Sequence, residues 1–435
     1  MAPLPPSAEP EDPSGGPERT HPDRRACSER DAADPLAFVR PRFVLPEGQV
    51  YLDGNSLGAL PRTVPDHLRR VVTEEWGEDL IRSWNKADWI GLPERVGARI
   101  APLIGARPHE VIVADSTSLN LFKLVVGALG LRPERRTLLT EADNFPTDRY
   151  MMEGACGLLG QGHRCRALEG RVDEDQVIAA LDDDTALVVL TQVDYRSGRK
   201  LDLARITGAA HDRGALVLWD LAHSAGAFDV DLEAAGADLA VGCGYKYLNG
   251  GPGAPAFLYV ADRWQEAIVP ALPGWMGHAA PFRLEPAYRP APALRRHLVG
   301  TPPILALAAL DAALGVWEGV DPVAVTRKGE ALTASFIQLA EARLGPEAGS
   351  LVSPREAARR GSQVCFAHPE AFAIMQALID VGVIGDFREP DILRFGFSPL
   401  YVGFADVWDA VDRWAAVLRS GRHREARFSR RGAVT

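Results

Sequence analysis

The sequence is short of cysteine and has no cysteine pairs. Its 435 residues include five cysteines, and none of them stands in a Cys-x-x-Cys spacing. This arrangement disfavours both a disulfide framework and a zinc site, so we expect no bound metal. Isolated thiols are typical of proteins kept in reducing surroundings, and we therefore expect a cytoplasmic location.

Long apolar runs and an excess of positive charge are also missing. No stretch approaches the roughly twenty apolar residues that cross a bilayer. The 48 basic residues are outnumbered by 58 acidic ones, for a net charge of −10. A membrane or a nucleic acid is therefore not expected as a partner. The chain begins with a segment rich in proline, glycine and acids that contains no apolar core, so we do not expect a secretory signal.

The rest of the composition suits an ordinary globular protein, with 46% apolar residues in a chain long enough for two domains. We expect five regions: a disordered tail (1–30), an arm that reaches the small domain and the edge of the active site (31–60), a large domain (61–320), a small C-terminal α+β domain (321–418) and a basic tail (419–435). For the basic tail, a solvated end and a contact with an acidic surface both remain open.

Apolar runs alternate with helical periodicity between residues 111 and 260. Residues 186–193 and 215–219 are almost continuously apolar, which is typical of parallel strands covered on both faces. A helix over 203–213 connects them. Strand–helix–strand units of this length predict an α/β fold with a mostly parallel sheet and right-handed crossovers. In such sheets, ligand groups collect at the carboxyl ends of the strands.

The stretch 218–253 carries the residues that point to a cofactor. Asp220 ends an apolar strand, His223 follows three residues later, and Lys246 lies between a further strand and a glycine-rich turn. A carboxylate can keep a pyridine nitrogen protonated, and a lysine amine can form a Schiff base with pyridoxal phosphate. Small and apolar neighbours make a lysine cation costly, which favours the amine that attacks carbonyls. An isolated lysine would be taken as a surface residue; the segment around Asp220 favours the cofactor.

Two other strand ends combine candidate ligand groups with ordinary structural alternatives. Ser116 and Thr117 open a helix, where small hydroxyl residues serve either as a cap or as a phosphate cradle. The spacing GxxxxGK[ST] is absent, so a nucleotide P-loop is not expected. Phe145 and Asp148 stand beside a proline after the next strand, where the ring could stack on a flat cofactor or simply belong to a stiffened loop.

Arg394 is exceptional because it lies between apolar neighbours in a strand of the C-terminal region. A buried arginine needs an anion. That anion is either an acid in a structural salt bridge, with Asp386, Glu389 and Asp391 as candidates, or the carboxylate of a substrate. Trp84 stands in a polar setting, and both packing and a substrate contact remain open for it.

Seven segments in order closely resemble the kynureninase family, whose members are pyridoxal-phosphate enzymes of fold-type I in the class V aminotransferase group. The segments are LDGNSLG, DSTSLNLFK, NFPTDRY, WDLAHSAGA, GCGYKYLNGGPG, GWMGH and RFGFSPLY. The resemblance runs from about residue 31 to residue 418. A single motif such as D-x-A-H occurs across the wider class, so the specificity comes from the seven segments together.

The resemblance implies a role for each matching residue. Lys246 would form the Schiff base, Asp220 would bond the pyridine nitrogen, and Tyr245 would either relay a proton or only bond the phosphate. The expected cofactor contacts are Ser116, Thr117, Phe145, Pro146, Thr147, Asp148, Asp220, His223, Tyr245, Lys246, Trp275 and Thr301. The expected substrate contacts are Ser56, Trp84 and Arg394.

The resemblance also implies a reaction and an assembly. The enzyme would hydrolyse the Cβ–Cγ bond of L-kynurenine, and of 3-hydroxykynurenine, to anthranilate or its 3-hydroxy analogue and L-alanine, in tryptophan catabolism and NAD-related metabolism. An aromatic residue at Trp84 is typical of bacterial members that prefer kynurenine. A homodimer is implied, with Trp275 and Thr301 near the interface; some relatives carry asparagine in place of Thr301.

Two other functions fit parts of the pattern. A cysteine desulfurase or an aminotransferase would share the fold, but a desulfurase needs an exposed cysteine on a mobile loop, whereas Cys243 and Cys365 stand in apolar strands. A protein that only binds the cofactor would lack the lysine or the carboxylate clamp. Both Lys246 and Arg394 are present, which favours an enzyme.

Overall fold

The apolar runs in the middle of the chain form one seven-stranded sheet in the computed structural model, which describes residues 22–430. The strand order is β4-β10-β9-β8-β7-β5-β6. The strands are β4 (Val111–Val113), β5 (Thr137–Glu141), β6 (Arg164–Leu168), β7 (Thr185–Thr191), β8 (Leu216–Asp220), β9 (Leu239–Gly242) and β10 (Phe257–Val260). All neighbours are parallel except β10, which is antiparallel to both β4 and β9. The predicted α/β class with a mostly parallel sheet is confirmed.

Both faces of this sheet are apolar and covered by helices. In β7, Leu187 and Val189 belong to one buried cluster and Val188 and Leu190 to another, because successive side chains point to opposite faces. The first cluster includes α5 (Thr117–Gly130) and α6 (Pro146–Leu159). The second includes α4 (Leu92–Ile100), α7 (Glu174–Ala180), α8 (Leu203–Asp212) and α10 (Ile304–Ala313). Further helices of the same domain are α2 (Thr63–Arg70), α3 (Ser83–Lys86) and α9 (Asp262–Gln265).

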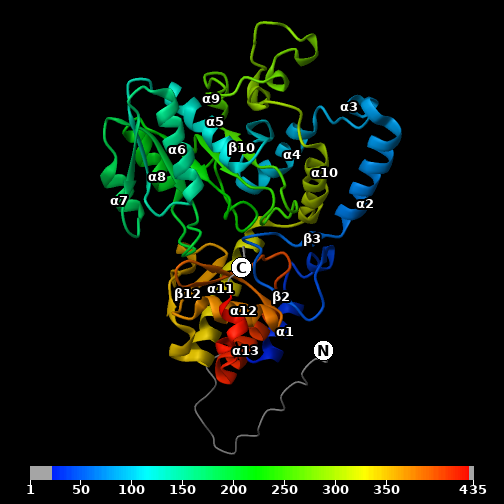
Figure 1. Cartoon of the computed structure of the whole chain (residues 1–435), viewed down its shortest axis with the longest axis vertical. Coiled ribbons are helices and arrows are strands. Elements are labelled where there is room, and N and C mark those ends of the chain that lie inside the picture. The colour runs from blue at the N-terminus through cyan, green and yellow to red at the C-terminus, as the bar shows by residue number, and fades with distance from the viewer. Residues whose placement is uncertain (1–21, 431–435) are drawn as a thin grey trace, which may run out of the picture.

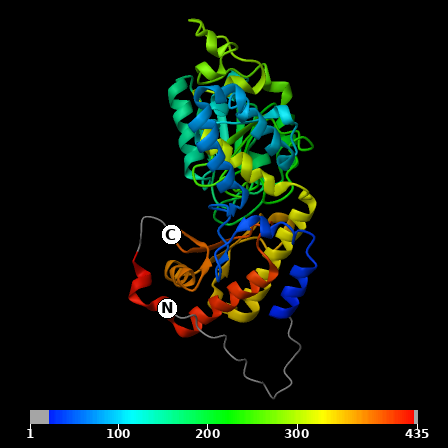
Figure 2. The same cartoon turned by 90° about the vertical axis from the view of Figure 1, so that its right-hand side faces the viewer.

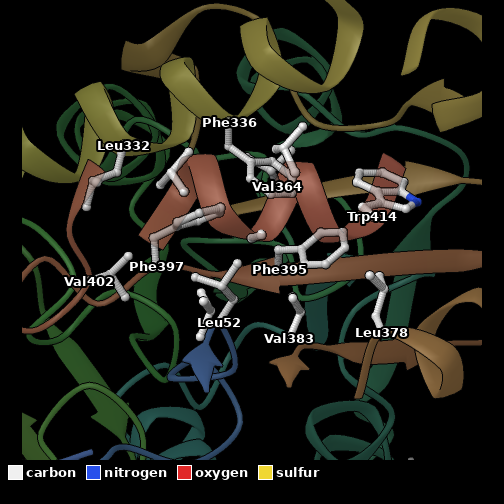
Figure 3. Close-up of a cluster of buried hydrophobic side chains, with 14 of the residues drawn as sticks. Leu52, Leu332, Phe336, Val364, Leu378, Val383, Phe395, Phe397, Val402 and Trp414 are labelled. Atoms are coloured by element: carbon white, nitrogen blue, oxygen red, sulfur yellow. The ribbon is translucent and has the colours of Figure 1, made fainter. Parts of the chain in front are cut away.

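The C-terminal part forms a second, smaller domain below the first (Figure 1). Its antiparallel sheet has the order β11-β12-β15-β14 and is formed by β11 (Ser350–Leu351), β12 (Gln363–Ala367), β14 (Asp386–Arg388) and β15 (Ile392–Gly396). The helices that pack on it are α11 (Pro322–Leu344), α12 (Ala371–Asp380) and α13 (Phe404–Ser420). Figure 3 shows the aromatic core between sheet and helices. In this core Trp414 stacks on Phe336, with 6.1 Å between the ring centres.

The N-terminal segment belongs to this small domain as well. Strand β2 (Val50–Tyr51) pairs in parallel with β13 (Val383–Ile384), and Leu52 joins the same core in Figure 3. The short strands β1 (Phe43–Val44) and β3 (Leu60–Pro61) pair with each other. Figure 2 shows the chain drawn out along one axis, with the large domain above the small one. The polypeptide therefore enters the small domain, builds the large one and returns.

Two expectations about the ends of the chain need correction. The disordered tail was expected to reach residue 30, but α1 (Arg24–Ala32) is a capped helix that buries Cys27. Asp31 in this helix accepts the amide hydrogens of Phe404 and Ala405 and so caps α13, which explains why the helix is held. The earlier part, 1–21, lies outside the described residues.

The basic end was expected to start as a tail at residue 419, and here too the structure differs. Phe428 is buried, and Arg422 and Arg427 both form ion pairs with Asp380 of α12. Arg422 and Arg427 therefore meet an acid of their own domain. Within residues 22–430 no helix is long and apolar enough to span a bilayer.

Candidate active site

The carboxyl ends of β8 and β9 bring three predicted site residues together. These strands are parallel neighbours, so Asp220 at the end of β8 lies close to the segment that follows β9. Lys246 in that segment has its Nζ 2.9 Å from His223 Nε2. The Asp220 side chain is buried, and its Oδ1 accepts the amide hydrogen of Ala222 at 2.6 Å. The sheet topology thus places a carboxylate, an imidazole and an amine in one pocket.

A second carboxylate faces Asp220 from helix α6. Burial and the neighbouring Asp220 raise the pKa of Asp148 well above its ordinary value. Burial also raises the pKa of Asp220, although Lys246 opposes that shift. Ionising both of two adjacent buried acids costs free energy, so the pair keeps a proton unless a cation binds beside it. A protonated pyridine nitrogen is a cation of the right kind.

The start of helix α6 presents an aromatic ring beside this pair. Phe145 is the N-cap residue of α6, and Pro146 and Thr147 are its first two helical residues. The Phe145 ring is 42% exposed and stands edge-on to Tyr195, with ring centres 5.3 Å apart. An exposed ring next to two buried acids can cover one face of a flat heterocycle.

Helix α5 begins at the predicted phosphate cradle. Ser116 is the N-cap residue, and its side chain accepts the amide hydrogen of Leu119 at 3.3 Å. Thr117 is the first helical residue. The structure therefore confirms the cap, and the same helix start has the geometry that favours a phosphate, since amide hydrogens and the helix dipole point the same way.

Arg394 of β15 is buried with only 1% of its surface exposed, and its partners are now defined. Asp386 accepts from Nε at 2.7 Å and from Nη2 at 2.5 Å, so it is the ion-pair partner among the three acids considered. Nη2 also donates to Ser56 Oγ at 2.9 Å, and Nη1 donates to the Tyr195 carbonyl at 2.8 Å. The structural salt bridge is present, and it holds the guanidinium next to Ser56.

The N-terminal arm closes the pocket between the domains. The amide of Gly58 donates to the Tyr245 carbonyl at 2.8 Å. A Cβ at Gly58 would meet the Lys246 carbonyl at 2.2 Å, so only glycine fits here. The Gly396 amide of β15 donates to the Leu52 carbonyl at 2.7 Å. The loop over residues 53–58 is thus held between the lysine segment and the strand that carries the arginine.

Two residues of this pocket escaped the sequence analysis. Gln363 of β12 donates to the Tyr195 carbonyl at 3.2 Å. Asp53 is half-buried, and burial together with Asp386 raises its pKa to about 7. Asp53 stands in the LDGNSLG turn, which gave a local signal, whereas Gln363 reaches the site only through tertiary packing.

Comparison with known proteins decides the family. The family model for the kynureninase C-terminal domain matches residues 325–414. A kynureninase of Deinococcus radiodurans is 55% identical over 393 residues, which are 89% of this chain and 94% of that protein. A kynureninase of Pseudomonas fluorescens is 49% identical over 416 residues, 95% of this chain and 99% of that protein. This chain belongs to the kynureninase family.

Solved structures of other enzymes share the fold. A cysteine desulfurase from Thermococcus onnurineus aligns with a TM-score of 0.72 at 18% identity, covering 88% of this chain and 97% of that one. A C-DES variant with glycine covalently linked to its pyridoxal phosphate cofactor aligns with a TM-score of 0.75 at 17% identity, covering 86% and 98%. These matches confirm fold-type I. Cys243 and Cys365 are buried, as the argument against a desulfurase required.

The buried groups around Lys246 suit the family's cofactor. His223 Nδ1 is buried and has no hydrogen-bond partner among residues 22–430. Burial, reinforced by Lys246, lowers the pKa of His223 well below its ordinary value, so the ring is neutral. An unpaired ring nitrogen, a lysine amine and a pair of acids that needs a cation fit pyridoxal phosphate. Among the described residues no group of three or more acids, histidines or cysteines is arranged to hold a metal.

Three predicted residues are not joined to this cluster within one chain. Trp84 in α3 is half-buried and packs edge-on against Trp89. Trp275 is 39% exposed and packs against Phe282, and Thr301 is exposed. Figure 1 shows the chain between α9 and α10 extending as a loop beyond the large domain, away from the small one.

Proposed function

We propose that this chain hydrolyses L-kynurenine to anthranilate and L-alanine at the junction of its two domains, with the residue roles given below. The observation that carries these roles is that Lys246 lies with the Asp148–Asp220 pair, and Arg394 with Ser56, at the junction of the two domains. The first two groups suit a pyridoxal ring, and the last suits an amino acid. 3-Hydroxykynurenine is the second substrate, and Trp84 favours kynurenine over it.

The residues of the large domain hold the cofactor. Bound pyridoxal phosphate supplies a protonated ring that accepts an electron pair from the substrate. Asp220 keeps the proton on the ring nitrogen, and Asp148 shares the negative charge with it. Phe145 covers one ring face, with Pro146 and Thr147 fixing its position, and Ser116 and Thr117 bind the phosphate. His223 offers its free ring nitrogen to the cofactor.

The residues of the arm and the small domain hold the substrate. Arg394 and Ser56 bind the α-carboxylate, and Asp386 fixes the plane of the guanidinium. Lys246, once its amine is free, removes the proton from Cα of the substrate. Burial raises the pKa of Tyr245, so its hydroxyl keeps its proton at neutral pH and can donate, either to the substrate carbonyl or to the phosphate.

The assembly is a cytoplasmic homodimer in which Trp275 and Thr301 complete the site of the partner subunit. Support comes from the protruding loop, which carries exposed Phe282 and Leu284 next to Trp275. Sedimentation of the loaded enzyme measures the mass directly, and a monomer at assay concentration that retains full activity contradicts this arrangement.

Two measurements test the proposal. Lys246→Ala removes the amine, so borohydride treatment should no longer fix the cofactor to the chain; a retained reducible chromophore contradicts the role of Lys246. Incubation with each substrate should release fluorescent anthranilate or its 3-hydroxy analogue. No product from either substrate contradicts the activity and leaves the fold unaffected.

A further inference from the structure

Helix α5 contains a buried lysine two turns after its start. Lys123 is only 1% exposed, and its Nζ donates to Asp115 Oδ2 at 2.5 Å and to the His297 carbonyl at 2.8 Å. Burial lowers the pKa of Lys123, and Asp115 opposes that shift. Lysine is rarely buried to this extent without a partner, because the charge loses its water. This ammonium is therefore held by two acceptors from separate parts of the chain.

The first acceptor controls the backbone before the cradle. Asp115 has φ of +47°, in the left-handed region that residues with a Cβ seldom adopt. The next residue is the helix cap Ser116, followed by Thr117. The Asp115 carbonyl accepts the amide hydrogen of Ala256 at 2.9 Å, so the turn is held on its other side by the sheet. Lys123 thus holds the left-handed turn at Asp115, and this turn sets the position of Ser116 and Thr117.

The second acceptor lies in the segment that leads to Thr301. His297 ends a short turn, and the Val299 carbonyl two residues later accepts the amide hydrogen of Met276 at 3.3 Å. Burial and then Lys123 lower the pKa of His297 to about 3, so its ring adds no second positive charge. One ammonium therefore joins the start of α5 to the unit formed by residues 274–278 and 297–301.

We propose that Lys123 is a positioning residue for the phosphate of the cofactor. It acts through Asp115 on the Ser116–Thr117 cradle and, through His297, keeps the segment before Thr301 in place. This inference rests on the proposed function, which puts the phosphate at the start of α5. It assigns Lys123 no contact with substrate or cofactor.

The test compares two probes on the full-length protein stripped of cofactor: pyridoxal phosphate, and pyridoxal, which lacks the phosphate. Lys123→Met keeps the length of the side chain and removes the charge. We expect the affinity for pyridoxal phosphate to fall about 10- to 100-fold, the size of a lost charged hydrogen bond, and the affinity for pyridoxal to change less than about 2-fold. An equal loss for both probes, or no loss for either, overturns the inference.

Matched variants separate positioning from stability. Leu129→Ala removes a buried apolar side chain from the same helix, so it should lower the melting temperature and leave the ratio of the two affinities unchanged. Lys123→Arg keeps a cation that can still bond Asp115 and should recover part of the ratio. If Lys123→Met does not fold, Asp115→Asn weakens the same ion pair without changing size and should lower the ratio in the same direction; an unchanged ratio overturns the inference.

A further variant distinguishes failure of this inference from failure of the cradle. The double change Ser116→Ala with Thr117→Ala should lower the affinity ratio because the cradle itself is altered. If this variant leaves the ratio unchanged, the phosphate is bound elsewhere, and both the cradle and the inference fail. If it lowers the ratio and Lys123→Met does not, only the role of Lys123 fails.

Discussion

Two pockets on either side of the domain junction each contain two acids and one basic side chain. They differ in whether the basic side chain is bonded to one of the acids. In the large domain, Asp148 and Asp220 face Lys246; beside the small domain, Asp53 and Asp386 face Arg394. Arg394 is bonded through two nitrogens to Asp386, whereas Lys246 is bonded to neutral His223. The acids of the first pocket therefore have no bonded cation, whereas those of the second pocket have Arg394.

The difference teaches what each pocket is prepared to bind. Buried acids without a bonded cation favour a positively charged ring. An arginine held in a fixed plane beside a hydroxyl favours a carboxylate, and its own acid keeps the empty pocket from carrying a costly buried charge. The proposed roles therefore put the cofactor and the amino acid on opposite walls of one junction.

Removing the acid of the first pocket should have the largest effect. Asp220→Ala is expected to lower kcat by at least about 10²-fold, the size observed when a group that stabilises developing charge is lost. Asp148→Asn should cost less, because it keeps the hydrogen bond and leaves Asp220 ionised. Steady-state kinetics at saturating cofactor measure both. Equal losses for the two variants would mean that the acids do not divide the roles as proposed.

Removing the cation of the second pocket should act on substrate binding instead. Arg394→Ala is expected to raise KM about 10- to 100-fold, because the α-carboxylate loses a charged hydrogen-bond partner and the buried Asp386 keeps only its second ion pair, with Arg388. The absorbance of the bound cofactor should not change, since Arg394 belongs to the other wall. Asp386→Asn is the matched variant and should raise KM less. A changed cofactor spectrum in Arg394→Ala would contradict the division into two walls.

The sequence predicted the first pocket better than the second, for a physical reason. Asp220, His223 and Lys246 follow neighbouring parallel strands, so strand order alone brings them together. Arg394 stood out because it interrupts an apolar strand, but its bond to Ser56 depends on the packing of two segments that lie 338 residues apart in the sequence. Gln363 and Lys123 carry no local pattern that distinguishes them from core polar residues. The ends of the chain were misjudged because Asp31 and Asp380 supply partners that composition does not show.

The smallest effect concerns Asp53, and it appears only as a dependence on pH. Burial and Asp386 raise the pKa of Asp53 to about 7 in the folded chain, against 3.8 ordinarily. Above that pH the ionised Asp53 adds a second negative charge beside Arg394, so KM should rise as the solution becomes more alkaline. Asp53→Asn removes the ionisation, and its KM should differ from that of the unchanged chain by about 3- to 5-fold at pH 8.5 and little at pH 6.

The stability of the folded chain should also decrease as the pH rises. A carboxyl whose pKa is higher in the folded chain favours folding only while it is protonated, so its contribution is complete below pH 3.8 and is lost as the pH rises through about 7. Urea unfolding at pH 6 and pH 8 should therefore show a smaller drop for Asp53→Asn than for the unchanged chain. Ser56→Ala alters the same pocket without a titrating group and should shift KM equally at both pH values. If Asp53→Asn behaves like Ser56→Ala, Asp53 does not ionise in this range, and the charge of the second pocket is balanced by Asp386 with Arg394 and Arg388 alone.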